Sequence, residues 1–152
     1  MIVNGSHLLA AAPLGPMETS KIRCEASGTS YGLSEGGYDV RLKQSITLHP
    51  FRLFALASTF ERFTMPDNLI GIVHDKSSLI RKGLMVGNSV IEPGWNGWLT
   101  IELFYFGWRP LRLTAGMGIA QVLFSELKEP AKYRGIYQNQ DDKPIQSKAY
   151  GV

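Results

Sequence analysis

The residues that decide the fold lie in two stretches, Asp75-Lys76-Ser77-Ser78-Leu79-Ile80-Arg81-Lys82-Gly83 and Gly97-Trp98-Leu99-Thr100-Ile101-Glu102-Leu103-Phe104-Tyr105. The second stretch is predicted to be a strand, in which residues two apart share one face. One face then holds Leu99, Ile101, Leu103 and Tyr105, and the other holds Trp98, Thr100, Glu102 and Phe104. The first face is typical of a core, and the second carries one acid among aromatic side chains.

Glu102 is the candidate catalytic residue on this strand. A carboxylate among apolar side chains is costly to desolvate unless it is paired, hydrogen-bonded or raised in pKa. The same environments produce general bases, so Glu102 is either a base or an ordinary paired glutamate at the edge of the sheet.

The stretch before it is predicted to form one short helix near residues 77–83. Ser77 and Ser78 lie at its amino end, where free backbone N–H groups favour phosphate, and Arg81 follows on the same face. Gly83 suits the end of the helix, where positive φ is common. The pattern predicts an anion-binding cradle, with a surface turn capped by ordinary serines as the alternative.

Short hydrophobic segments separated by turn residues predict an all-β fold with low helix content. Residues 1–20 suggest a strand followed by an irregular arm, and residues 27–37, rich in Gly and Ser, suggest a loop. Glu92-Pro93-Gly94-Trp95 fits a type II turn. The expected strands are 38–42, 46–48, 53–57, 61–65, 69–73, 85–86, 97–105, 111–113 and 119–124.

Composition limits the classes of function. The 152 residues are 44% hydrophobic and 19% charged, with a net charge of +3 and a single cysteine, Cys24. Scattered cations argue against a nucleic-acid partner and allow a small phosphate-bearing ligand. No stretch reaches the length of a membrane span, and one cysteine suits a reducing cytoplasm, so we expect a cytoplasmic protein without a membrane partner.

The chain is expected to form a single domain with two parts. Residues 1–127 are predicted to form the β-barrel, and residues 128–152 a carboxy-terminal arm or lid, because the sequence becomes polar after Leu127. A plain solvated terminus is the alternative.

Several motifs together resemble the dCTP deaminases of the dUTPase superfamily. They are Lys76-Ser77-Ser78-Leu79-x-Arg81-x-Gly83, Ile91-Glu92-Pro93-Gly94-Trp95-x-Gly97, Glu102, and Pro110-Leu111-x-Leu113-x-x-Gly116-Met117-x-Ile119-x-Gln121. Their order and spacing are more specific than any one motif. The resemblance implies a distorted jelly-roll-like β-barrel of the dUTPase type, assembled as a homotrimer with sites at subunit interfaces.

The resemblance also implies the chemistry. It implies deamination of dCTP to dUTP and ammonia without zinc, and the sequence agrees, because a zinc deaminase needs further cysteines. Mg²⁺ would arrive with the triphosphate and would not be held by protein side chains. Glu102 matches the general base, and Ser77 and Arg81 match its catalytic partners. The matched nucleotide-binding positions are Lys76, Ser77, Ser78, Arg81, Glu92, Trp95, Thr100, Ile101, Glu102, Gln121, Tyr133 and Gln140.

Three departures bear on the substrate. Lys76 stands where the family usually has Arg, the segment 87–90 is about two residues shorter than usual, and Ile136 replaces a common Lys. They leave open whether the protein also hydrolyses the triphosphate to dUMP and diphosphate. They also leave two other functions open, a dUTP pyrophosphatase using Glu92 and a non-catalytic nucleotide-sensing trimer.

Overall fold

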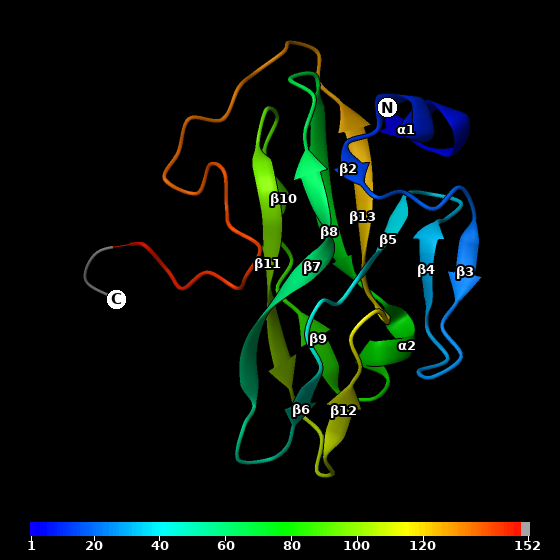
Figure 1. The fold of residues 1–152 in the computed structure, drawn as a ribbon, viewed down its shortest axis with the longest axis vertical. Helices are drawn as coiled ribbons and strands as arrows, with labels where there is room; N and C mark the ends of the chain where they lie inside the picture. The colour runs from blue at the N-terminus through cyan, green and yellow to red at the C-terminus, as the bar shows by residue number, and fades with distance from the viewer. Residues whose placement is uncertain (150–152) are drawn as a thin grey trace.

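The computed structural model describes residues 1–149 and consists mainly of β-strands (Figure 1). Its helices are α1 (Gly5–Ala11) and α2 (Ser77–Ile80). The strands are β1 (Ile2–Val3), β2 (Leu14–Gly15), β3 (Lys21–Arg23), β4 (Ser30–Leu33), β5 (Tyr38–Arg41), β6 (Ile46–Leu48), β7 (Phe54–Thr64), β8 (Leu69–Asp75), β9 (Leu84–Val86), β10 (Val90–Ile91), β11 (Asn96–Tyr105), β12 (Leu111–Leu113) and β13 (Gly118–Glu126). The predicted all-β class and low helix content are confirmed.

Two curled sheets enclose the core. A seven-stranded sheet has the order β10-β8-β13-β5-β4-β3, with β1 also pairing with β13, and a four-stranded sheet has the order β2-β7-β11-β9. β6 pairs with β12 at one end of the molecule (Figure 1). This is the jelly-roll-like arrangement that the family resemblance implied.

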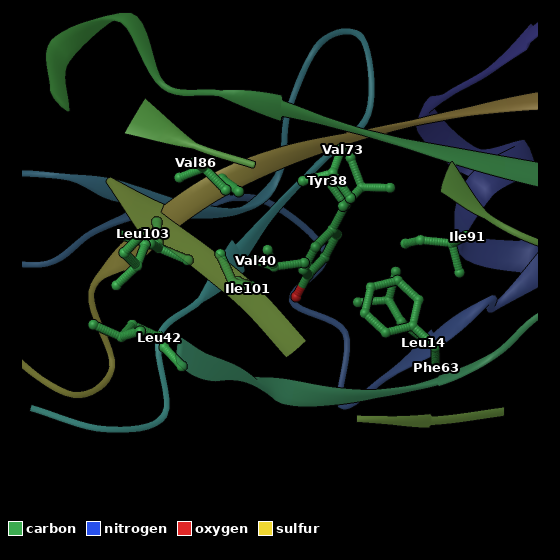
Figure 2. Packing of buried hydrophobic residues seen from close by; sticks show 14 of the residues in the cluster. Leu14, Tyr38, Val40, Leu42, Phe63, Val73, Val86, Ile91, Ile101 and Leu103 are labelled. Atoms are coloured by element: carbon green, nitrogen blue, oxygen red, sulfur yellow. The ribbon is translucent and has the colours of Figure 1, made fainter. Parts of the chain in front are cut away.

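The core lies between the two sheets and is built from alternate residues of their strands. Figure 2 shows Tyr38 and Val40 of β5 among side chains from the facing strands, including Ile101 and Leu103 of β11. All four side chains are almost completely buried. Each such side chain contributes about 1.5–3 kcal/mol through burial, so β11 is held firmly by its inner face. Its outer face is therefore free to carry polar groups.

Three segments differ from the sequence-based expectation. The amino terminus forms α1, whose Leu8 is fully buried, although seven residues are too few to show a clear helical period. β4 lies inside the segment 27–37, which is rich in Gly and Ser and was predicted to be a loop. The strands β3 and β5 pair with it on its two sides. The segment 53–65 is dominated by one strand, β7, and not two. β7 pairs with β11 along most of its length, and the Ser58 N–H donates to Gln44 Oε1 at 2.9 Å.

The short helix is confirmed, but it is shorter than predicted. α2 ends at Ile80, and a turn continues to Gly83, whose φ is +84°. The Gly83 N–H donates to Ile80 O at 2.8 Å, and Phe106 N–H donates to Gly83 O at 2.8 Å. In the part of the chain described, no helix is long and apolar enough to cross a membrane.

Candidate active site

Glu102 lies in the middle of β11, opposite Leu56 of β7. Its carbonyl accepts the Gly87 N–H at 2.8 Å, which fixes the backbone on the side of β9. The carboxylate is half-buried and lines a pocket of about 580 Å³. Burial raises the pKa of Glu102 above its ordinary value of 4.5. A carboxylate with this environment can take a proton from water.

The pocket in front of Glu102 has the size and character of a site for a nucleobase with its sugar. Besides Glu102, its polar side chains include those of Glu92, Thr100, Gln140, Ser147, Ser89 and Gln146, and the rest of the wall is apolar or aromatic. The other lining residues are Phe54, Leu56, Val90, Ile91, Trp95, Leu99, Tyr133, Tyr137 and Ile145.

A register shift in β11 alters the predicted alternation at Leu99. The pairing with β7 slips between Trp98 and Thr100, and the Leu99 N–H donates to Thr59 Oγ1 at 3.1 Å. Leu99 therefore lines the pocket together with Thr100, although strict alternation had placed it in the core. The alternation holds beyond the shift, because Ile101, Leu103 and Tyr105 are buried.

Gly87 packs directly against the catalytic candidate. A Cβ at this position would lie 3.1 Å from both Cβ and Oε2 of Glu102. Such a contact is tight enough to displace the carboxylate. Gly87 thus brings backbone, without a side chain, up to Glu102.

The turn at residues 92–95 has the predicted type II geometry. Gly94 has φ of +68°, and the Trp95 N–H donates to Glu92 O at 3.2 Å. The turn leaves Glu92 exposed at the edge of the pocket and buries Trp95 against Phe63, with ring centroids 6.1 Å apart. Glu92 and Trp95 thus line the pocket from one corner.

The carboxy-terminal arm lies along β11 of its own chain. Trp95 Nε1–H donates to Tyr137 O at 2.7 Å, and Asn96 N–H donates to Gln138 Oε1 at 2.8 Å. Gln140 pairs with Gly97, where a Cβ would lie 2.5 Å from Gln140 N. The absence of a side chain at residue 97 therefore lets the arm approach.

Farther along, the arm covers the pocket. Thr100 Oγ1 accepts the Ile145 N–H at 3.0 Å and lies 3.4 Å from Gln140 Oε1. Ile145, Gln146 and Ser147 contribute to the pocket wall. Residues of the segment predicted as an arm thus form one side of the site, whereas residues 150–152 lie outside the described part.

A second pocket, of about 480 Å³, contains the two serines of the predicted anion cradle but not Arg81. Lys76, Ser77, Ser78 and Gln121 line it, as do residues of the β3–β4 hairpin. Lys76 Nζ is paired with Asp39, and both side chains are largely buried. The pocket is mainly polar, which suits phosphate groups better than a nucleobase.

The predicted site residues fall into two separate groups in one chain. Glu92, Trp95, Thr100, Glu102, Tyr133 and Gln140 line the first pocket, whereas Lys76, Ser77, Ser78 and Gln121 line the second. Arg81 is exposed and lines neither of these two pockets, and the Ile101 side chain lies in the core.

Sequence reasoning missed several residues of these pockets. Tyr137 and Leu99 belong to the first pocket, and Lys21 and Asp39 to the second. Tyr137 is next to Gln138 in the predicted arm, so its place in the sequence could have indicated that it lines the pocket. Lys21 gave none, because only the hairpin pairing brings it to the cradle. Among residues 1–149, no three His, Cys, Asp or Glu side chains gather as a metal site.

Comparison with solved structures shows the fold. The dUTPase of Staphylococcus bacteriophage 80alpha superposes with a TM-score of 0.57 at 15% identity, over 81% of this chain and 94% of that one. The EIAV dUTPase gives 0.56 at 18% identity, over 80% and 95%. At these identities the similarity concerns the fold alone.

Comparison of sequences shows the family. The dCTP deaminase of Campylobacter curvus is 35% identical over 74% of this chain and 78% of its own length. The dCTP deaminase of Roseiflexus castenholzii is also 35% identical, over 73% and 78%. The family model for dCTP deaminase-like proteins matches residues 33–127. These matches, which span the Glu102 strand and the cradle, show that the chain belongs to the dCTP deaminase-like family.

Proposed function

We propose that this protein deaminates dCTP to dUTP and ammonia, with Glu102 as the general base. The observation that carries the proposal is a half-buried carboxylate, raised in pKa, that lines a pocket of nucleobase size in a chain of this family. The sequence agrees, since its one cysteine does not provide the ligand set of a zinc deaminase.

The reaction needs one water and one proton carrier. Glu102 takes a proton from water as the oxygen attacks C4 of cytosine, which forms a tetrahedral centre. The electron pair of the C4=N3 bond moves onto N3 during this attack. The protonated Glu102 then returns the proton to the exocyclic amino nitrogen, the bond from C4 to that nitrogen breaks as C4=N3 re-forms, and ammonia leaves. The proton of the new C4 hydroxyl moves to N3, which gives the keto form of uracil. The atoms of dCTP and water are thus recovered in dUTP and ammonia, and Glu102 ends deprotonated.

The triphosphate would bind in a cradle like the second pocket, contributed by a neighbouring subunit. The two pockets share no lining residue, and Arg81 lies on the surface next to exposed Ile80. Phe54 and Phe104, near Glu102, are also substantially exposed and have ring centroids 5.1 Å apart. Burying these apolar groups between copies supports a homotrimer in which Ser77 and Arg81 of one subunit complete the Glu102 site of the next.

This arrangement predicts complementation between two inactive variants. Arg81→Ala loses a charge-assisted contact to the nucleotide and Glu102→Gln loses the base, so each homotrimer is expected to be inactive. Refolded as an equal mixture, about a quarter of the sites would combine a native Arg81 with a native Glu102 from the neighbour. Activity of the mixture in a dCTP assay is the measurement. A mixture as inactive as its parents would place both residues in one subunit's site.

Mg²⁺ would accompany the triphosphate. Asp39 lines the second pocket, and among the described residues its buried Oδ1 has no hydrogen-bond partner. Such an oxygen fits an acceptor for water carried by Mg²⁺, which keeps several waters when it binds phosphates. The ion would neutralise phosphate charge, and Asp39 would orient its hydration shell.

The raised pKa of Glu102 predicts the acid limit of activity. A general base works only when deprotonated, so kcat/KM should fall as pH drops through the Glu102 pKa. Because burial raises that pKa, the fall should be centred above 4.5, the ordinary value for glutamate. A pH profile of kcat/KM, with circular dichroism to confirm folding at each pH, measures this. A profile that stays flat down to 4.5 would contradict the assignment.

Product analysis tests the proposed function. Incubation with Mg²⁺ and dCTP should give dUTP and ammonia, resolved by ion-exchange chromatography. The short 87–90 segment and Glu92 at the pocket edge favour a second candidate activity, hydrolysis of dUTP to dUMP and diphosphate. dUMP from dCTP would show both activities, and dUMP from dUTP alone would show a pyrophosphatase. Nucleotide binding without turnover would show a sensor and overturn both.

A further inference from the structure

The β3–β4 hairpin brings a lysine to the second pocket. Lys21 pairs with Gly32 in β4, Gly32 pairs with Asp39 in β5, and Asp39 pairs with Gln121 in β13. Directly opposed residues of neighbouring strands share one face of a sheet. Lys21 therefore lies in the same cross-strand row as Asp39 and Gln121, and all three line the second pocket.

Gly32 lies in the middle of this row. Its φ is +96°, and a Cβ there would lie 2.4 Å from Ser20 O, so the position requires glycine. Lys21 lines the pocket together with Thr29 and Ser30 of the same hairpin, which add hydroxyl groups to the wall.

The two lysines of the pocket differ in how firmly they are held. Lys76 is paired with Asp39, and the two side chains are only 10% and 4% exposed. Breaking that pair would leave Asp39 as a buried, uncompensated charge. Lys21 is paired at 2.6 Å with Glu35, whose side chain is 87% exposed. Water and salt screen such a surface pair, so it exchanges easily for another anion.

The other carboxylate of the pocket does not compete for Lys21. Asp75 Oδ1 accepts the Val86 N–H, and Asp75 belongs to β8 on the far side of β13. Lys21 is consequently the pocket's most available cation, although Lys76 is the one that the sequence motif indicates.

We propose that Lys21 is a phosphate-binding residue of the second pocket and that it exchanges Glu35 for the triphosphate of the bound nucleotide. The proposal rests on the proposed function, because it takes this pocket as the triphosphate site. In this proposal Lys76 has a different role, which is to hold Asp39 in place within the cradle.

The test compares two variants that break the same ion pair. Lys21→Ala and Glu35→Gln both remove the Lys21–Glu35 contact, but only the first removes the cation. We expect Lys21→Ala to raise KM for dCTP by roughly 10-fold or more with kcat little changed, the usual effect of losing a charge-assisted contact. Glu35→Gln should leave KM unchanged or lower it, and Lys21→Arg should restore much of the affinity.

Binding measurements separate this proposal from the proposed function. Calorimetric titration of the full-length protein with inorganic triphosphate and Mg²⁺ needs no turnover, and Lys21→Ala should weaken this binding while Glu35→Gln should not. Equal binding by both variants, or equal loss in both, would overturn the role of Lys21. Failure of the wild-type protein to deaminate dCTP would instead overturn the proposed function and leave the triphosphate titration as the test of Lys21.

Discussion

Replacing Glu102 with glutamine is expected to lower the rate of dCTP deamination by about 10²- to 10⁴-fold while the protein still folds and assembles. The amide keeps the shape of the side chain beside Gly87 but cannot take the proton of water. Single-turnover kinetics with saturating dCTP measure the loss, and gel filtration and circular dichroism confirm the fold. Turnover close to wild type would remove Glu102 from the catalytic role.

Glu92→Gln is the matched control, because both glutamates line the first pocket. Glu92 is exposed at the edge, whereas Glu102 is half-buried with a raised pKa. For dCTP deamination the loss should be much larger at Glu102. A larger loss at Glu92, measured with dUTP as substrate, would favour the pyrophosphatase.

Deleting residues 134–152 is expected to abolish most activity, on the order of 10²-fold, and to weaken nucleotide binding. The deletion removes Tyr137, Gln140 and Ile145 from the pocket wall and opens the Glu102 carboxylate to bulk water. The barrel should remain folded, because the side chains of residues 134–149 lie outside the buried hydrophobic core. Calorimetry with dCTP and thermal unfolding measure the two effects.

Thr100→Val gives a milder version of the same change. It removes the hydroxyl that accepts the Ile145 N–H but keeps the arm and the shape of β11. Nucleotide affinity should fall between that of the wild type and that of the truncated protein.

For the deletion itself, full activity of the truncated protein would show that residues 134–152 are a terminus without a role as a lid.

Local sequence patterns predicted the parts of the site that depend on a single segment. The alternation around Glu102, the type II turn at 92–95 and the short helix after Lys76 each follow from a few neighbouring residues. The burial of Ile101 and Leu103, the positive φ of Gly94 and that of Gly83 confirm them.

Features that depend on pairing between distant segments were not predictable in this way. Leu99 reaches the pocket only because β7 and β11 slip in register, and Lys21 reaches the cradle only through three successive strand pairings. The strand β4 carries a sequence that favours loops, and its neighbours on both sides determine its conformation. In each case tertiary contacts outweigh local preference.

The separation of the two pockets also has a functional consequence. A general base beside an apolar pocket works best when it is partly buried, because burial strengthens its electrostatic interactions. A cradle that binds charged phosphates instead needs polar groups around it. Separate sets of lining residues in one chain let each pocket be built independently. A subunit interface, as proposed above, would then bring them together around one nucleotide.

The origin of the product oxygen tests the central claim most directly. After a single turnover of dCTP with Mg²⁺ in ¹⁸O-labelled water, mass spectrometry of the product locates the new oxygen. Attack of water on C4 predicts one ¹⁸O atom in the uracil base, with the triphosphate unlabelled. Label found only in the phosphate groups, with the base still cytosine, would contradict deamination and show hydrolysis of the triphosphate instead.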